Sequence, residues 1–300
     1  MSRTAKPTQP DLMYYSIIEH GWHEKIKRNK LSDFSIVWSG HKILLNLEND
    51  YYGAEFWQRI ETMQYEPDTQ WFISQFCNTQ TDFIDIGAAN GAMTLLASIC
   101  GATVNAFEPD PLIYSVLEKN VNLNSELSKR IQLNSAAISD SQQEVEFSKG
   151  ANPEILSSIL FGGSQNSDTS VVVRDLSNEL DLIHGDENRK LVIKMDIEGA
   201  EWKTLRSRRV LTSLSDHNAV MLLAVHPGFT KPFPAFASKN LILRFPWLIS
   251  HFTDSLALFV RLNEFGTVYR TNLNPISNKF KFAMLVISGY YEFVIRFGKS

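Results

Sequence analysis

The sequence predicts an α/β fold with a mostly parallel sheet and helices on both faces. Residues 81–108, TDFIDIGAANGAMTLLASICGATVNAFE, contain an apolar run, a turn of small residues, a helical pattern and a second apolar run. The alternation of strand and helix continues after residue 108, which is the pattern that builds parallel sheets. Asp85 and Glu108 end the first two apolar runs. Ligands of open α/β sheets bind at the carboxyl ends of the strands, so these two acids also indicate where the site lies.

The residues before position 81 predict an extension and two helices that lead into the sheet. Residues 1–10 are polar and contain Pro, as flexible tails do, and residues 11–30 have helical spacing. Two short apolar runs around Ser39-Gly40 predict a β-hairpin. The expected strands of this hairpin are 34–37 and 42–47, and the expected helices are 54–65 and 68–76. We assign residues 1–50 to an N-terminal extension and residues 51–300 to one domain.

From residue 82 onward the pattern alternates between strands and helices. After the first strand–helix–strand unit, the expected strands are 131–137, 171–173, 191–195 and 220–225, and the expected helices are 111–124, 177–184, 200–210 and 240–259. Three apolar runs at 267–273, 283–288 and 293–297 predict an antiparallel edge of the sheet. Residues 150–170 are rich in Ser, Asn and Gly, which indicates either a mobile loop over the site or a surface insertion.

Composition limits the class of protein. A chain of 300 residues with 44% hydrophobic content can bury a full core. The net charge of -4 argues against a general nucleic-acid binder, because no overall basic field neutralises phosphates. Two Cys are too few for a disulfide framework, so we expect a reducing, cytoplasmic compartment.

We also expect no secretory signal and no transmembrane segment. The polar N-terminus is not followed by the apolar core of a signal peptide. The two longest apolar stretches, 241–260 and 282–297, are interrupted by charged residues, Pro or Gly. Neither reaches the length needed to span a bilayer, although a peripheral contact with a membrane stays open.

The turn after the first strand indicates a nucleotide-like ligand. Gly87 and Gly91 can adopt positive φ or admit a ligand atom where a Cβ would collide. The amides that begin the next helix favour a carboxylate or phosphate. Glu108 follows Asp85 by a little over twenty positions, which is the spacing that places an acid on ribose hydroxyls in nucleotide-binding βαβ units.

The spacing of the glycines excludes two common ligand motifs. The turn reads G-x-x-x-G, and lacks both the dinucleotide motif G-x-G-x-x-G and the phosphate-binding G-x-x-x-x-G-K-[S/T]. S-adenosylmethionine remains as the common ligand, with its ammonium on Asp85, its carboxylate on backbone amides and its ribose on Glu108. The alternative is a tight strand-to-helix turn in another kind of α/β protein.

A series of sequence blocks resembles the FkbM family of S-adenosylmethionine-dependent methyltransferases over residues 51–229. The blocks are YEP (65–67), DIGAANG (85–91), FEPDP (107–111), AAISD (136–140), VRDL (173–176) and LVIKMDIEGAEW (191–202). The chain has Ala88-Ala89 where the family usually has Ala-Asn, and Met-Asp-Ile-Glu at 195–198 where Ile-Asp-Val-Glu is typical. Both departures are small. Nothing after about residue 231 resembles a family block.

The resemblance implies a class I methyltransferase fold, which is Rossmann-like with a seven-stranded sheet, and S-adenosylmethionine as the cofactor. It adds Glu66, beside Tyr65, as a contact to the methionine end of the donor. The expected cofactor-binding residues are Glu66, Asp85, Gly87, Ala88, Ala89, Asn90, Gly91, Glu108, Pro109 and Ala136.

The candidate catalytic residues are Asp196, His226 and Glu198. Asp196 and His226 directly follow expected strands, so they should share the edge with Asp85 and Glu108. Asp196 is the first candidate, as a general base or an orienting group. His226 is the second, because its ordinary pKa suits proton abstraction near neutrality.

Each candidate also has an alternative interpretation. Glu198 and Glu201 can cap the first turn of a helix, which we favour for Glu201. His226-Pro227-Gly228 can be turn chemistry. Asp196 and Glu198 could hold a divalent cation, but two carboxylates at one strand end are too few, and we predict no metal.

The resemblance implies O-methylation of a hydroxyl on a glycan, glycolipid or secondary metabolite. Residues 240–300 hold seven Lys or Arg against three acids, which suits an anionic acceptor surface or, as we favour, balances the acidic remainder. A non-catalytic nucleotide-fold module with an assembly or regulatory role is the alternative. A nicotinamide oxidoreductase is disfavoured by the turn. The sequence gives no indication of the oligomeric state.

Overall fold

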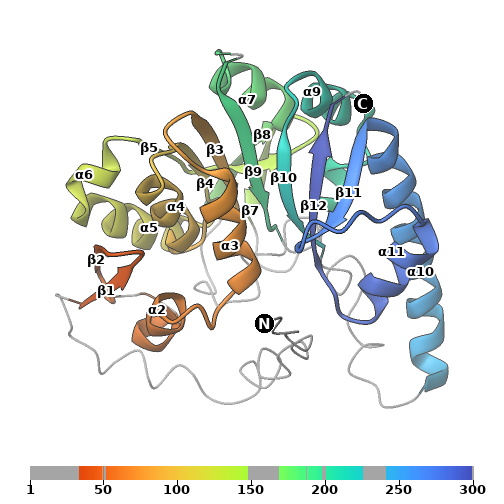
Figure 1. Cartoon of the computed structure of the whole chain (residues 1–300), viewed down its shortest axis with the longest axis horizontal. Helices are drawn as coiled ribbons and strands as arrows, with labels where there is room; N and C mark the ends of the chain where they lie inside the picture. Colours follow the sequence, from red (N-terminus) through yellow and green to blue (C-terminus); the bar gives the residue numbers. More distant parts are fainter. Residues whose placement is uncertain are drawn as a thin grey trace, which may run out of the picture.

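The computed structural model describes residues 34–48, 50, 52–147, 169–186, 188–197, 201–225 and 241–298. Its centre is a seven-stranded sheet in the order β11-β12-β10-β9-β3-β4-β5 (Figure 1). The strands are β3 (Thr81–Ile86), β4 (Thr103–Phe107), β5 (Ile131–Asn134), β9 (Lys190–Met195), β10 (Val220–Ala224), β11 (Gly266–Arg270) and β12 (Glu292–Phe297). The five strands from β10 to β5 are parallel, and β12 is antiparallel to both β10 and β11. The predicted fold class, including the antiparallel edge, is confirmed.

The sheet separates two hydrophobic cores, because successive residues of a strand point to opposite faces. On β3, for example, Ile84 packs in one core and Phe83 in the other. Helices on the Ile84 side are α7 (Leu176–Ile183), α8 (Glu201–Thr204), α9 (Arg208–Asp216), α10 (Leu241–Phe265) and α11 (Lys279–Ile287). Helices on the Phe83 side are α2 (Gly53–Glu61), α3 (Pro67–Phe76), α4 (Ala92–Ile99) and α5 (Pro111–Leu123), and the short α6 (Ser125–Ser128) follows α5.

The hairpin of β1 (Phe34–Trp38) and β2 (His41–Leu45) packs into the core on the Phe83 side. Figure 1 shows it beside α4 and α5, at the opposite end of the molecule from α10 and α11. Its inward side chains, including Ile36, Ile43 and Leu45, are fully buried. The hairpin therefore shares a core with the parallel sheet, while the division of the chain at residue 50 stays a prediction.

Three predicted elements differ from the structure. The strand expected at 131–137 ends at Asn134, and β6 (Ala137–Ser139) instead joins β7 (Gln143–Phe147) and β8 (Thr169–Asp175) in a second sheet of order β6-β8-β7. The strand expected at 283–288 lies in helix α11. Asn278 caps this helix, because its side chain accepts from the amides of Phe280 and Lys281.

The helix expected at 200–210 is divided between α8 and α9. The helix expected at 11–30, residues 148–168 of the polar loop, and Glu198 and His226 lie outside the described residues. Within the described part of the chain, no helix combines the length and apolar character that crossing a membrane requires.

Candidate active site

The candidate site lies at the edge of the sheet where β3, β4, β9 and β10 end. Because these strands are parallel, their carboxyl ends lie together, and Asp85, Glu108 and Asp196 are at or next to three of them. Strand β12 runs in the opposite direction, so its first residue, Glu292, pairs with Ala224 at the carboxyl end of β10. The fold therefore adds Glu292 to this edge.

The glycine turn, residues 87–91, has left-handed backbone at three positions. The φ angles are 82° at Gly87, 50° at Ala89 and 92° at Gly91. A Cβ on Gly91 would lie 2.7 Å from Cδ1 of Leu117, and a Cβ on Gly87 would overlap the backbone carbonyl of Asp196. Both glycines are thus required by the packing of the turn against the protein itself.

Several amides of the glycine turn have acceptors within the protein. The amides of Gly87 and Ala88 donate to the carbonyl oxygen of Phe107, at 3.1 and 3.0 Å. The amide of Gly91 donates to the carbonyl oxygen of Ala88 at 3.0 Å. These three amides stabilise the turn and its junction with β4, while the predicted contact between the donor carboxylate and the amides that begin α4 stays a prediction.

Glu108 also contacts the glycine turn. Its Oε2 accepts from the amide of Ala89 at 3.0 Å, and its Oε1 accepts from the amide of Asp110 at 2.9 Å. Burial raises the pKa of Glu108 to about 7, although these two backbone bonds offset part of the effect. Each carboxylate oxygen has a second lone pair, so Glu108 can still accept from two hydroxyl groups, as the predicted ribose contact requires.

We expect binding of S-adenosylhomocysteine to strengthen as the pH rises from 6 to 8. With a pKa of about 7, roughly one tenth of Glu108 is ionised at pH 6, and the ionised form accepts hydroxyl hydrogen bonds better. The dissociation constant at pH 6 should therefore exceed that at pH 8 by up to about tenfold. Calorimetry on wild type and Glu108→Gln measures this. The variant should bind more weakly with a flatter pH profile, and an unchanged profile would exclude Glu108 as the titrating group.

Lys194 lies at the centre of the buried charges. It is directly opposite Asp85 in the register of β3 and β9. Its Nζ donates to the carbonyl oxygen of Gly87 at 2.9 Å, and lies 3.5 Å from Oδ1 of Asp85 and 3.7 Å from Oδ2 of Asp196. Thr94 of α4 donates to the other oxygen of Asp85 at 2.7 Å. One ammonium group thus connects the first strand, the glycine turn and the candidate base.

The charges of this group depend on one another. Burial raises the pKa of Asp85, and the charge of Lys194 and the hydroxyl of Thr94 oppose that rise. Burial would lower the pKa of Lys194, but Asp85, Asp196 and Glu66 hold it above its usual value. Lys194 is 6% exposed and Asp85 is fully buried, so a charge on either group is stabilised by its partners in the protein and not by water.

Two further carboxyl groups lie near Asp196. Glu66 directly precedes α3 and has a left-handed backbone with φ of 43°; burial and the charge of Asp196 raise its pKa. Glu292 accepts from the hydroxyl of Thr69 at 3.1 Å. Burial raises the pKa of Glu292 to about 8, and the charges of Glu66 and Asp68 add to this effect. The predicted residues Glu66 and Asp196 are thus brought together.

The other predicted site residues differ in burial and in the part of the fold where they lie. Asn90 is 2% exposed within the turn, and Pro109 is half-buried after Glu108. Ala136 is fully buried in the core on the Ile84 side. Glu201 accepts from the amide of Ile197 at 3.2 Å, as the capping interpretation of this residue requires. The roles of Glu198 and His226 stay predictions, because neither is described.

Sequence reasoning did not single out Lys194, Thr94 or Glu292. A lysine inside the apolar run LVIKM was a usable signal, because a buried cation requires carboxylate partners. Glu292 gave no such signal, since its position depends on the direction of β12.

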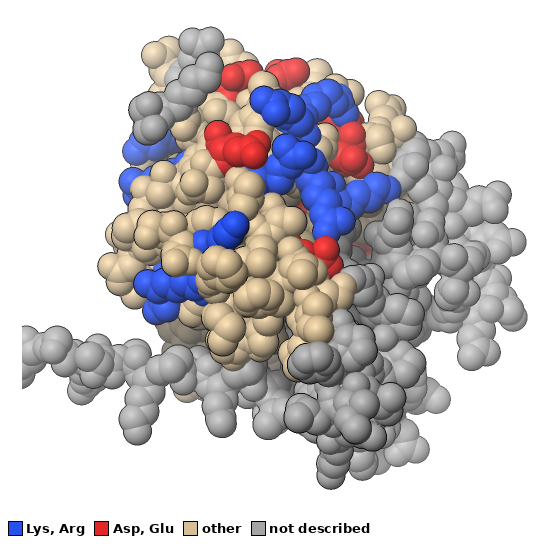
Figure 2. Space-filling model, turned by 90° about the vertical axis from the view of Figure 1, so that its right-hand side faces the viewer, with Lys and Arg blue, Asp and Glu red and all other residues tan. Residues whose placement is uncertain are grey.

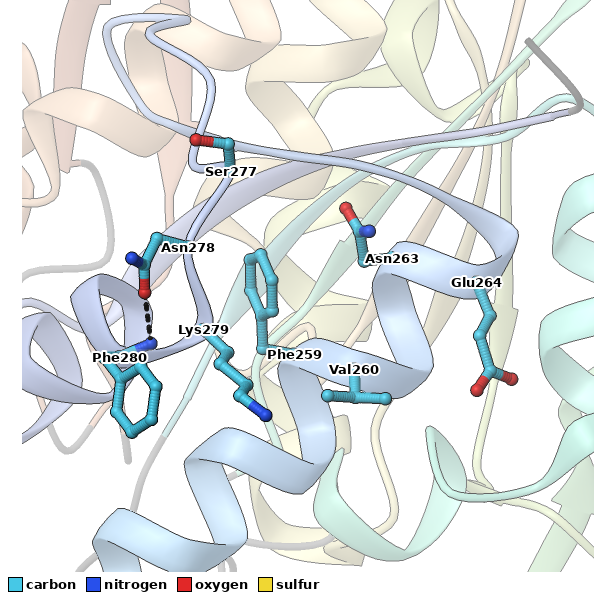
Figure 3. A pocket seen from close by; sticks show the side chains of 8 residues that line it. All are labelled: Phe259, Val260, Asn263, Glu264, Ser277, Asn278, Lys279 and Phe280. Atoms are coloured by element: carbon cyan, nitrogen blue, oxygen red, sulfur yellow. Dashed lines mark hydrogen bonds between the residues drawn. The ribbon is translucent and has the colours of Figure 1, made fainter.

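Other features of the described residues do not add to this site. A pocket of about 460 Å³ lies between α10 and the start of α11 (Figure 3), and none of its lining residues is a predicted site residue.

Figure 2 shows basic side chains among acidic ones on the side of α10 and α11. In two of the ion pairs of α10, Arg206 pairs with Asp254 at 2.8 Å and Arg261 with Glu264 at 3.5 Å, which is consistent with a balance of charge. Among the described residues, no group of three or more His, Cys, Asp or Glu could hold a metal ion.

The residues fit S-adenosylmethionine. Oδ1 of Asp85 accepts no hydrogen bond and lies 3.5 Å from Nζ of Lys194, so it has capacity for an ammonium group once the atoms that cover it move aside. Glu108 can accept from a ribose diol. Asp85 and Glu66 would hold the methionine end, and Glu108 the ribose.

Comparison with known proteins gives the family. A model described as the methyltransferase FkbM domain matches residues 85–244, which is more than half of the chain. A protein-lysine methyltransferase of Bos taurus, METTL21E, is 31% identical over 87 residues, and this match covers 29% of each chain. The chain therefore matches less than a third of that relative's length.

Solved structures of methyltransferases are also similar. An FkbM methyltransferase from Methylobacillus flagellatus is 15% identical, with a TM-score of 0.35 and coverage of 58% of this chain and 51% of that chain. A tRNA (uracil-54, C5)-methyltransferase from Pyrococcus abyssi, in complex with S-adenosyl-L-homocysteine, is 9% identical, with a TM-score of 0.30. The match covers 64% of this chain and 34% of that chain. On the match of the domain model, the chain belongs to the FkbM family of S-adenosylmethionine-dependent methyltransferases.

Proposed function

We propose that the enzyme methylates a hydroxyl group on a glycan, glycolipid or secondary metabolite, with Asp196 as the general base. The observation that carries this proposal is the exposure of Asp196. Its side chain is 24% exposed, whereas that of Asp85 is fully buried and Glu108 is 5% exposed as a residue. Among the acids that end β3, β4 and β9, Asp196 is thus the one that an acceptor can approach.

The chemistry of Asp196 supports a hydroxyl acceptor. The bound donor supplies an electrophilic methyl group on a sulfonium. An alcohol oxygen that forms a bond to this carbon must lose its proton, and the electron pair of the broken carbon–sulfur bond stays on sulfur. Asp196 takes the proton, and Nζ of Lys194, 3.7 Å from its Oδ2, holds this carboxylate in place beside the glycine turn.

We also propose that the enzyme acts in the cytoplasm. Both Cys77 and Cys100 are free thiols, with Cys77 buried, as expected in a reducing compartment.

Labelled methyl transfer tests the proposed acceptor. The protein is incubated with S-adenosylmethionine carrying an isotopic methyl label and with separate glycan, lipid, metabolite and protein fractions of the source cells. We expect label in a glycan, lipid or metabolite fraction, and mass spectrometry should locate it on an ether oxygen. Label on nitrogen, as on a protein lysine, would contradict O-methylation. Absence of label in every fraction, despite intact binding of S-adenosylhomocysteine, would contradict the proposed substrate classes.

A further inference from the structure

Asp50 connects the segment before α2 to the glycine turn. It is 6% exposed and precedes the region that the family model matches. One of its oxygens, Oδ2, accepts from the indole Nε1 of Trp57 at 2.8 Å and from the side-chain Nδ2 of Asn90 at 3.5 Å. The other, Oδ1, accepts from the amide of Tyr52 at 3.0 Å. A buried carboxylate is thus shared between the N-terminal segment and the turn.

Asn120 of α5 provides a second connection to the same turn residue. Its Nδ2 donates to the carbonyl oxygen of Asn90 at 2.9 Å, while its Oδ1 accepts from the amide of Asn46, just after β2, at 2.8 Å. Asn120 is fully buried and Asn90 is 2% exposed. Both the side chain and the backbone of Asn90 are therefore held by residues that also contact the N-terminal segment.

The backbone of the turn explains why it needs such support. Ala89 has a φ of 50°, a left-handed conformation that residues with a Cβ rarely adopt. Such conformations persist only where the surrounding structure holds them. Glu108 bonds the amide of Ala89 on one side, and Asp50 and Asn120 hold Asn90 on the other.

We propose that Asp50 is a positioning residue for the methyl donor, which acts through Asn90 to hold the glycine turn in its binding conformation. The segment before the matched domain is then part of the donor site, although it need not touch the donor. This inference rests on the use of S-adenosylmethionine and is independent of the identity of the acceptor.

Exchange of the two side chains tests the proposal. In Asp50→Asn one carbonyl oxygen remains where two carboxylate oxygens accepted three hydrogen bonds, and in Asn90→Asp two carboxylates face each other. Each single variant should raise the dissociation constant of S-adenosylhomocysteine about tenfold in calorimetry, as expected when a buried polar group loses its hydrogen-bond partner. The double variant Asp50→Asn/Asn90→Asp restores an amide–carboxylate pair with reversed polarity. It should recover part of the lost affinity but not all of it, because Oδ2 of Asp50 also accepts from the indole Nε1 of Trp57, and that bond is not restored.

A matched control separates positioning from stability. Ser98→Ala removes a hydrogen bond between the fully buried hydroxyl of Ser98, in the last turn of α4, and the carbonyl oxygen of Leu127, at 3.0 Å, at the end of α4 away from the glycine turn. It should lower the melting temperature but leave the dissociation constant unchanged, because a loss of folded protein changes the calorimetric stoichiometry rather than the affinity. Equal affinity of Asp50→Asn and wild type, or a double variant no better than the weaker single variant, would overturn the proposal. If Asp50→Asn alone fails to fold, the comparison of Asn90→Asp with the double variant decides.

Discussion

Replacing Lys194 with Met should make the protein easier to unfold and abolish methyl transfer. Lys194 is almost fully buried, with its Nζ within 4 Å of Asp85 and Asp196. Removal of one partner from a buried ion pair leaves an uncompensated charge, which typically costs about 3–5 kcal/mol in the free energy of unfolding. The variant also loses the hydrogen bond to the carbonyl oxygen of Gly87, so donor binding should fail. Urea unfolding and calorimetry with S-adenosylhomocysteine measure the two effects.

The loss of stability should depend on pH in a defined direction. Burial raises the pKa of Asp85 above its unfolded value of about 3.8, and Lys194 opposes this, so the variant should raise the pKa further. An acid whose pKa is higher in the folded state stabilises the fold below its unfolded pKa and loses that contribution as the pH rises through the folded pKa. The difference in unfolding free energy between wild type and variant should therefore be smaller at pH 5 than at pH 8.

Two further variants test the cause of this effect. Lys190→Met removes an exposed lysine at the start of the same strand and should change the unfolding free energy little. Asp85→Asn combined with Lys194→Met removes the uncompensated charge and should regain part of the lost stability, though not donor binding. If Lys194→Met were as stable as wild type at pH 8, the charge of Asp85 would not depend on Lys194 for its stabilisation, and the proposed coupling between the two residues would be wrong.

Replacing Asp196 with Asn should reduce kcat by about 10²–10⁴-fold, the usual contribution of a general base. The change keeps the shape of the side chain but removes its capacity to take a proton. Binding of S-adenosylhomocysteine should stay within a few fold of wild type, because Asp85, Glu66 and Glu108 remain. Single-turnover methyl transfer with the acceptor found in the labelling experiment measures the effect.

Asp216→Asn is a suitable control for this variant. Asp216 is exposed at the end of α9, just before β10 begins, and so lies toward the opposite edge of the sheet. The kcat of Asp216→Asn should equal that of wild type. If Asp196→Asn also retains full kcat, the proton is taken by another group, and the proposed role of Asp196 is wrong.

The sequence predicted the parallel part of the sheet because each of its strands is a short apolar run, and acids follow three of them. Strands β3, β4, β9 and β10 lie close to their expected bounds. The run at 283–288 was assigned wrongly, since a short apolar run does not distinguish a strand from a buried helix. The cap at Asn278 was the missed signal. Likewise, periodicity marks β6 as a strand but cannot say with which sheet it pairs.

The same limit applies to the site. Asp85, Glu108 and Asp196 were predictable because parallel strands place their carboxyl ends at one edge. The pairing of Asp85 with Lys194 depends on β3 and β9 being neighbours, although they are distant in the sequence. The contact of Asp50 with Asn90 depends on how the N-terminal segment packs. Such tertiary relations are not encoded in spacing along the chain.

The place of β12 has a consequence for assembly of the protein. This strand comes after all other described strands in the sequence, yet it lies between β10 and β11. Until it inserts, β10 presents unpaired backbone groups and β11 has no neighbour in the sheet, and open strand edges of this kind promote aggregation. Translation must therefore pass residue 297 before the sheet can close, so the edges of β10 and β11 stay open until β12 has been synthesised.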